Sequence, residues 1–476
     1  MQSLLAIFTA QSPRLSPRSI PLASRVINLA APLVFVVLIA QAFLRQGLAI
    51  WSVGIAYILY DTALLVFTAW QIRNLAQTAT PAPSGVQPSF GVIVAAHNEA
   101  GVIRLAIDRL LAQDQPPEAI LIADDGSSDD TPSAMAAGYA LATPPLGELV
   151  EIGVGHTRLQ WLRLPHGGKA RALNAALERI ATDVVLTVDA DTLIEPGSIA
   201  AMRAAFSAEP ELVAATGVLA PICGPNLSGR IFEWFQSYEY VRNFLSRDAW
   251  MRIDGLLLIS GAFAAFRRDA VLTVGGFDPD CMVEDYELIH RLHRHAHDAG
   301  LHWTVRVVGG ALARTDAPAS IPAFLKQRQR WFGGFLQTQH WNRDMVGNAR
   351  YGRLGTRMLP VKALDTVQPI YGLAAFAVLI GLVVTGRFTL AFPILLVMIA
   401  KIAIDLSFHL WSLGIYKRWT GQREGLNLGP AIVAAIAEPF SFQLLRHAGA
   451  VYGWYAFLRG GQTWSAQTRT ALDQRA

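Results

Sequence analysis

The sequence predicts a doubly wound α/β domain flanked at both ends by transmembrane α-helices. Three observations lead to this fold class. The 476 residues are 52% hydrophobic and only 16% charged, which is too apolar for an ordinary soluble domain. The apolar excess lies at the two ends of the chain. The middle instead alternates short apolar runs with amphipathic segments, as expected for strands and helices that follow one another.

Two nearly uncharged runs stand near the N-terminus, at residues 26–44 and 50–70. Each is close to the roughly 20 residues that cross about 30 Å of hydrocarbon, so we expect a transmembrane hairpin. A cleaved signal peptide at residues 1–10 is the alternative. We disfavour it because that run has no basic n-region and no small-residue cleavage site after it.

Basic residues flank this hairpin unevenly. Most of them precede the first run or follow the second, and the loop between the runs offers one. By the positive-inside rule, the N-terminus and the central domain are expected on the cytoplasmic side of the cell inner (plasma) membrane. The residues outside the hairpin are Arg14, Arg18, Arg25 and Arg73, and the one in the loop is Arg45.

The C-terminal third carries two more candidate spans, at residues 369–384 and 388–413. We expect a basic loop on the cytoplasmic side after them, containing Lys417, Arg418 and Arg423. The last apolar stretch, residues 426–458, is interrupted by polar residues and proline. It is compatible with a fifth span, a re-entrant segment or an interfacial helix.

Composition also bears on partners and redox state. The net charge is only +4, and Lys and Arg concentrate beside the spans, where membrane lipids explain them, so no nucleic-acid binding is indicated. Cys223 and Cys281 both fall in the part expected in the reducing cytoplasm, and we expect free thiols.

The central domain follows a Pro-rich linker at residues 81–88. Apolar runs at 91–96, 119–123 and 184–188 read as buried parallel strands, each followed by polar or acidic residues. Ligands bind at the carboxyl ends of such strands, so the predicted site is acidic. We expect four parts: 1–80 with the hairpin, 81–317 as the catalytic domain, 318–358 as interfacial helices, and 359–476 as the C-terminal membrane region and tail.

The third strand ends in Asp189-Ala190-Asp191. An acidic site that handles a phosphorylated ligand needs a divalent cation, because carboxylates alone repel a diphosphate. Asp189 and Asp191 are therefore candidate ligands for Mg²⁺ or Mn²⁺. The plainer interpretation is that they cap or turn the chain at the strand end.

Several motifs in consistent order resemble the processive branch of glycosyltransferase family two, which includes poly-N-acetylglucosamine, hyaluronan, chitin and cellulose synthases. The resemblance covers residues 90–334 well and the flanking spans in kind, and it implies a GT-A-type fold. The motif at residues 327–331 is the most specific. The motifs are Val94–Glu99, Asp124–Asp129, Gly168–Asn174, Asp189–Asp191, Ser260–Arg267, Glu284–Asp285 and Gln327–Trp331.

The resemblance implies a nucleotide-sugar donor, most simply a UDP-sugar, and a metal-dependent inverting transfer. The first strand end and Asp125 would hold the uracil and ribose, while Lys169 would lie near the donor and Arg330 would bind the phosphates. Without the resemblance, Lys169 reads as a surface lysine at a helix start. The implied donor-binding residues are Ala95, Asn98, Glu99, Asp125, Lys169, Asp189, Gln327 and Arg330.

Asp285 is the candidate catalytic base, because inversion needs one carboxylate to take the proton of the acceptor hydroxyl. The alternative is that Glu284 and Asp285 only begin a helix. The family assigns Trp331 to the acceptor, and the segment around it also suits an amphipathic interfacial helix. Val283 and Ala262 depart from residues common in relatives, which bears on acceptor contacts.

The resemblance implies a synthase that extends a β-linked polysaccharide, most like the poly-N-acetylglucosamine branch, with a polysaccharide or lipid-linked acceptor and possible export partners. One alternative is a non-processive transferase that adds one hexose. Another is a non-catalytic assembly or export subunit, which the intact set of acidic residues disfavours.

A histidine-rich run, His290, His293, His295 and His297, follows Asp285. Its spacing permits a metal site. We expect instead a solvated helix face, since the run is distant in sequence from the Asp-x-Asp turn.

Overall fold

The computed structural model describes residues 3–76, 87–422 and 427–460. Nine strands form one mixed sheet in the order β3-β4-β2-β1-β5-β8-β7-β9-β6. The strands are β1 Phe90–Ala96, β2 Ala119–Asp125, β3 Leu149–Val154, β4 Thr157–Leu164, β5 Val184–Asp189, β6 Thr192–Ile194, β7 Leu212–Ile222, β8 Phe263–Arg267 and β9 Thr304–Asp316.

The parallel heart of the sheet is made of the three apolar runs that the sequence marks as strands. β1 lies between β2 and β5, and Ala95 is in register with Ala123 on one side and Asp189 on the other. The polar residues after these strands therefore meet at one edge, as predicted. The α/β class is confirmed, but the sheet is mixed, because β3, β6 and β8 run antiparallel to their neighbours.

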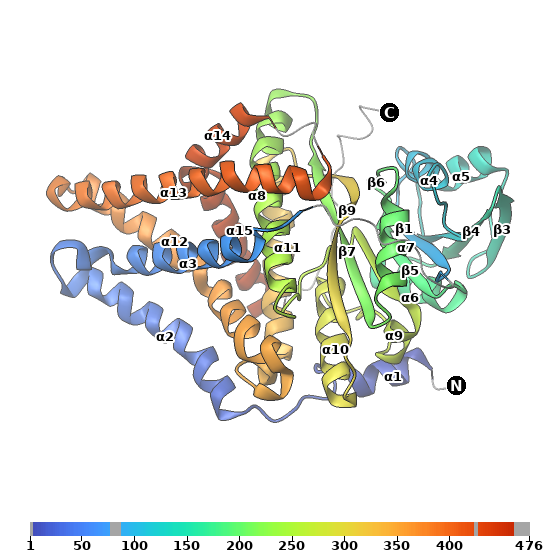
Figure 1. The fold of residues 1–476 in the computed structure, drawn as a ribbon, viewed down its shortest axis with the longest axis horizontal. Helices are drawn as coiled ribbons and strands as arrows, with labels where there is room; N and C mark the ends of the chain where they lie inside the picture. Colours follow the sequence, from blue (N-terminus) through green and yellow to red (C-terminus); the bar gives the residue numbers. More distant parts are fainter. Residues whose placement is uncertain (1–2, 77–86, 423–426, 461–476) are drawn as a thin grey trace.

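The helices form three groups (Figure 1). One group lies around the sheet, another crosses beside it, and the third projects away from it. The first group is α1 Leu4–Gln11, α4 Ile103–Leu111, α5 Thr131–Tyr139, α6 Lys169–Arg179, α7 Ser198–Ala208, α9 Arg268–Thr273 and α10 Glu284–Ala299; the second is α8 Leu227–Met251, α11 Ile321–Trp341, α14 Leu428–Ala437 and α15 Phe442–Leu458; the third is α2 Leu22–Leu44, α3 Ser52–Ile72, α12 Leu359–Val384 and α13 Phe388–Thr420.

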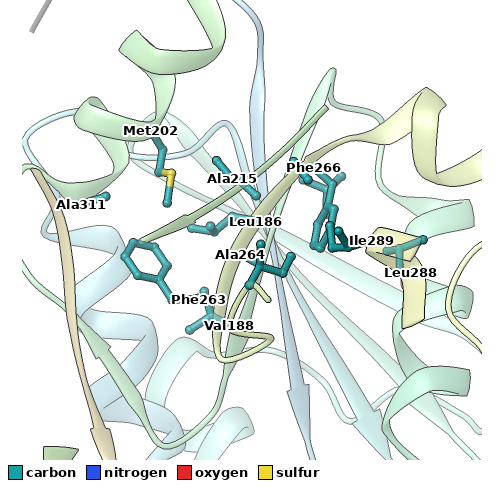
Figure 2. Close-up of a cluster of buried hydrophobic side chains, with 14 of the residues drawn as sticks. Leu186, Val188, Met202, Ala215, Phe263, Ala264, Phe266, Leu288, Ile289 and Ala311 are labelled. Atoms are coloured by element: carbon teal, nitrogen blue, oxygen red, sulfur yellow. The ribbon is translucent and has the colours of Figure 1, made fainter. Parts of the chain in front are cut away.

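The core of the sheet domain is aliphatic and aromatic on both faces of β5 and β8. Figure 2 shows Leu186 of β5 and Phe263 of β8 beside Met202 of α7, with Ile289 of α10 nearby. All four side chains are at most 1% exposed. This packing holds α10, the helix that begins with Glu284 and Asp285, against the sheet edge.

Four helices in the described part of the chain have the length and apolarity needed to cross a membrane: 22–44, 47–72, 354–384 and 388–420. They match the four predicted spans with longer ends. The third starts well before residue 369, since Pro369 lies inside α12 instead of beginning it. Lys417 and Arg418 likewise belong to the last turn of α13, not to a loop, while Arg423 and residues 81–86 of the expected linker lie outside the described residues.

The last apolar stretch is a helix pair, α14 and α15, bent by 50° at a short break. Counted as one span, the pair would make a fifth. α15 lies along α11, where a Cβ at Gly453 would meet the Gln329 carbonyl and one at Gly449 would meet Arg328. Because Gly449 and Gly453 have no side chains, α15 can pack closely against α11.

The N-terminal arginines do more than flank a span. Arg14 pairs with Asp278 and Asp280, both at 3.0 Å, and Arg18 pairs with Asp298. Our expectation that positive-inside bias suffices to explain them was therefore incomplete, since they tie the segment before α2 to the α10 region. The same contacts hold the N-terminal segment on the side of the sheet domain.

A buried ion pair fixes α10 to the chain before it. Arg291 and Glu287 are both completely buried, with Nε and Oε1 2.7 Å apart. The Arg291 guanidinium also donates to the carbonyl groups of Val274 and Gly276, both at 2.6 Å. Removing one partner of such a pair leaves an uncompensated buried charge.

We expect Arg291→Met to lower the free energy of unfolding by about 3–5 kcal/mol, because Glu287 loses its counter-charge. Thermal unfolding of the detergent-solubilised protein measures the change. Arg306→Met is the matched control, since its pair with Glu209 is partly exposed (27% and 30%) and should be worth at most about 1 kcal/mol. Equal melting temperatures for the two variants would contradict the assignment.

Candidate active site

One cavity of about 890 Å³ joins the sheet edge to the membrane-facing helices. Its walls come from segments spread along most of the chain. All the candidate residues from the sequence line it together: Ala95, Asn98, Glu99, Asp125, Lys169, Asp189, Asp191, Asp285, Gln327, Arg330 and Trp331. The structure therefore brings the whole predicted set to one place.

Asp125 anchors one end of the cavity. Its carboxylate accepts the backbone N–H groups of Gly167 and Gly168, at 2.7 and 2.9 Å. Gly168 has φ +95°, a conformation that glycine adopts without strain, and it leads directly into α6. Asn98 has φ 58°, and its side-chain oxygen accepts the N–H of Ser128 at 2.8 Å. These contacts tie the ends of β1 and β2 to the start of α6.

Two histidines lie beside Asp125. The rings of His97 and His166 are stacked with centroids 4.3 Å apart, and the Nδ1 atoms of both lie within 3.1 Å of the Asp125 carbonyl oxygen. Within the described residues, His97, Asp125 and His166 form a group close enough to hold a metal ion. However, the Asp125 carboxylate already accepts two backbone N–H groups, and His166 Nδ1 lies 3.0 Å from its Oδ2 as well as near the Asp125 carbonyl. The group fits a platform for a planar ligand better than a metal site.

The carboxylates after β5 form a crowded acidic cluster. Burial and the nearby charges of Asp189 and Asp316 raise the pKa of Asp191 well above the usual range of an aspartate. Asp316 stands at the end of β9, and its backbone N–H donates to the Asp191 carbonyl at 3.2 Å. Closely packed oxygen ligands with excess negative charge suit a hard divalent cation, so Asp189 and Asp191 fit the metal role.

Lys169 connects this cluster to α10. Its Nζ lies 2.7 Å from Asp189 and 3.2 Å from Glu284. Burial disfavours the charged ammonium, but Asp189 and Glu284 outweigh it and raise the pKa of Lys169. The plain interpretation of Lys169 as a surface lysine is therefore wrong.

Asp285 stands in the first turn of α10 and faces the cavity. Its two carboxylate oxygens accept the backbone N–H groups of Gly261 at 2.6 Å and Tyr286 at 2.8 Å. Burial and the Glu284 carboxylate raise the pKa of Asp285, and Lys169 opposes this rise. A Cβ at Gly261 would lie 2.9 Å from Asp285, so the small residue allows this approach. The helix-start interpretation also holds.

The segment 327–331 lies in α11 and turns toward the cavity. Gln327 is buried, and Arg330 donates weakly to the Met282 carbonyl at 3.4 Å. Trp331 lies under the guanidinium of Arg328, 4.4 Å from the ring centroid. Arg328 in turn makes two 2.8 Å hydrogen bonds to Glu239 of α8. The indole is thereby held in place at the cavity wall.

The histidine run is only in part the solvated face that we expected, since His297 is exposed and His295 is half-buried. His290 and His293 are buried, and burial lowers their pKa values to about 3 and about 4. Each bonds a backbone carbonyl, of Tyr286 and Leu256 respectively. They are neutral structural groups, because the inward face of an amphipathic helix recurs every three or four residues.

Beyond Trp331 the cavity continues between α3, α8, α12, α13 and α15, where charged side chains face one another. Lys401 lies 2.6 Å from Asp61 and also bonds Asp405, and Arg242 lies 3.7 Å from Asp61. Charged groups at such depth are costly unless they pair or line a polar cavity, and these do both. This part of the wall is polar and nearly balanced in charge.

Sequence reasoning missed several lining residues. Asp316, Arg247 and Lys362 reach the cavity from segments without a recognisable motif. For Asp316, the position at a strand end was an available signal. Arg247 lies in a long amphipathic helix, where no local pattern separates it from a solvated arginine.

Two family models match this region. Residues 91–275 match the family described as glycosyl transferase family 2, and residues 184–404 match glycosyl transferase family group 2. The two matches overlap and together cover residues 91–404. The resemblance drawn from the motifs is thus confirmed, and the family-two region includes the sheet, the candidate residues and the first helices that follow them.

Two curated proteins are similar to part of this chain. A poly-beta-1,6-N-acetyl-D-glucosamine synthase of Staphylococcus epidermidis is 27% identical over 282 residues, which are 59% of this chain and 62% of that protein. One from Staphylococcus aureus is 26% identical over 245 residues, 51% of this chain and 53% of that protein. This chain therefore spans less than two thirds of either relative.

A solved structure is similar to this chain in fold. It is a mannosyltransferase from Pyrobaculum calidifontis in complex with GDP-mannose and Mn²⁺, with a TM-score of 0.55 and 20% identity, covering 82% of this chain and 99% of that one. The likeness confirms the GT-A-type fold predicted from the motifs.

Proposed function

We propose that this chain transfers a sugar from a UDP-sugar to the end of a growing β-linked polysaccharide, with inversion, most like a poly-N-acetylglucosamine synthase. One observation carries the proposal. A single cavity is lined by the acidic strand ends, by Asp285 and by Trp331, and it extends between the apolar helices. The similarity to poly-beta-1,6-N-acetyl-D-glucosamine synthases supports this choice of product.

In the proposed reaction, an acceptor hydroxyl oxygen attacks the anomeric carbon as the Asp285 carboxylate takes the hydroxyl proton. The bond from the anomeric carbon to the diphosphate oxygen breaks, and the nucleoside diphosphate leaves. The N–H groups of Gly261 and Tyr286 orient the Asp285 carboxylate. Its raised pKa makes it a stronger base than an exposed aspartate.

The donor would lie between Asp125 and α11. The stacked rings of His97 and His166 would support the base, and Arg330 would donate to the diphosphate. When bound at Asp189 and Asp191, Mg²⁺ or Mn²⁺ would neutralise the leaving diphosphate. The Mn²⁺ in the mannosyltransferase supports a divalent ion in this fold.

We further propose that the protein is a multi-pass protein of the inner (plasma) membrane with the sheet domain in the cytoplasm. The four apolar helices support membrane insertion. Nucleotide sugars are cytoplasmic, and the Arg14 and Arg18 ion pairs keep the basic N-terminal segment beside the sheet domain. The acceptor is a polysaccharide end, or a lipid-linked glycan if only one sugar is added. Export partners would meet the product on the far side.

Removal of the divalent ion should abolish transfer, because the diphosphate would then face unshielded carboxylates. Asp191→Asn should weaken Mn²⁺ binding by an order of magnitude or more, measured by titration without any sugar donor. Asp183→Asn, at the opposite end of β5, is the control and should bind Mn²⁺ normally. Full activity in excess chelator would refute the metal role.

Asp285→Asn should reduce the transfer rate by about 10²–10⁴-fold while donor binding stays near the wild-type value. The wild-type rate should fall as the pH falls through the pKa of Asp285. Because this pKa is raised, the loss should begin at higher pH than for an ordinary aspartate at about 3.9. Asp298→Asn, on the exposed end of α10, is the control. Retention of more than a tenth of the rate would exclude Asp285 as the base.

Trp331→Ala should shorten the product or abolish it, because a stacked indole holds the acceptor end at little entropic cost. Gel analysis of product length gives the result. Donor binding should fall less than in Arg330→Ala, and Trp341→Ala, at the far end of α11, should leave product length unchanged. A Trp331→Ala enzyme with unchanged length and rate would favour single-sugar transfer instead.

A further inference from the structure

Arg247 of α8 is a partly buried cation that has no ion-pair partner among the described residues. Its Nε and Nη1 atoms are buried without a hydrogen bond, and among the described residues no carboxylate forms an ion pair with it. Its guanidinium lies over the Phe244 ring, 4.5 Å from the centroid. Leaving guanidinium N–H groups unsatisfied away from water is costly, so such a group calls for a ligand.

The side chain lines the same cavity as Asp285 and Trp331. It reaches that wall from α8, whereas the donor-side residues come from the sheet edge and α6. Lys362 and Asp365 of α12 line the same part of the cavity and pair with each other at 2.9 Å. The N–H groups of Arg247 that lack a hydrogen bond therefore reach the cavity from α8, on the side that we assign to the acceptor.

Charge indicates what kind of ligand fits. Burial lowers the pKa of Arg247 to about 10, so the guanidinium remains charged at neutral pH, and the Asp285 carboxylate partly opposes this shift. The charge of Lys362 is balanced by Asp365. The remaining positive charge, on Arg247, is offset by the nearby Asp285 carboxylate. A neutral ligand keeps this balance, whereas an anionic ligand would add charge beside Asp285.

We propose that Arg247 binds the acceptor, donating its free N–H groups to hydroxyl or acyl oxygens on the terminal sugar of a neutral glycan. This inference rests on the proposed transfer function. Arg247 would fix the sugar ring from α8 while Trp331 supports its face from α11. The planar fork of the guanidinium suits two neighbouring oxygens on one ring, which a lysine ammonium cannot match.

The experiment compares Arg247→Gln and Arg247→Lys with the control Arg252→Gln. Arg252 lies on the same helix, outside the cavity, and pairs with Asp248. Initial rates are measured with UDP-N-acetylglucosamine and a short β-1,6-linked N-acetylglucosamine oligomer, each varied at saturating concentrations of the other. UDP binding is titrated separately, and melting temperatures are recorded.

We expect Arg247→Gln to raise the KM for the oligomer about tenfold or more, with UDP affinity within twofold of wild type. Arg247→Lys should recover only part of the loss. The melting temperature should stay the same or rise, because N–H groups that are buried without a hydrogen bond are removed. The control should match wild type in the KM for the oligomer and in UDP affinity, although its melting temperature should fall because buried Asp248 loses its counter-charge.

An oligomer KM within twofold of wild type in Arg247→Gln would overturn the proposal, as would a lowered melting temperature with equal losses for donor and acceptor. If the wild-type protein transfers no sugar from any nucleotide donor, the proposed function itself fails. That result is distinct from active enzymes that do not differ at Arg247.

Discussion

The Lys169 ammonium, which lies 2.7 Å from Asp189 and 3.2 Å from Glu284, is the contact on which the geometry of the site depends. It joins the carboxyl end of β5 to the start of α10. The candidate metal ligand Asp189 is thereby linked to the helix turn that holds the candidate base, Asp285. Without a cation between them, the carboxylates of Asp189, Glu284 and Asp285 would repel one another in a partly buried place. The constraint is electrostatic: acidic groups can be gathered at a strand edge only if positive charge is gathered with them.

The same constraint extends into the helical part of the protein. Arg328 is matched by Glu239, and Lys401 is matched by Asp61 and Asp405. These pairs line a continuous cavity instead of facing lipid, which reduces the cost of burying them among apolar helices. A wall of balanced charges and aromatic rings suits a neutral, hydroxyl-rich chain, because it offers many hydrogen bonds and no strong fixed charge. Arg247 is the exception in this wall, and its free donors lie where an acceptor end would meet the base.

Much of the site could be predicted from the sequence because its residues lie in short motifs at the ends of apolar runs. The strands at 91–96, 119–123 and 184–188 were recognisable as unbroken apolar runs. Their polar ends had to meet at one edge of a parallel sheet. The later strands of the sheet were not recognisable in this way. β8 and β9 belong to the sheet through long-range pairing, which leaves no local signal. The burial of His290 and His293 was missed for a related reason, since composition does not reveal which side of a helix faces the core.

By itself the sequence determined the α/β class, the four apolar spans, the family resemblance and the set of acidic and basic residues available for chemistry. These follow from local periodicity and short motifs, which depend on neighbouring residues alone. Only the tertiary structure decided that Lys169 is an ion-pair bridge, that Arg14 and Arg18 hold the α10 region, and that Arg247 lines the same cavity as Asp285. Each of these depends on contacts between segments that are far apart in the chain. Burial and pairing of a charged side chain are set by such contacts, so no local pattern can specify them.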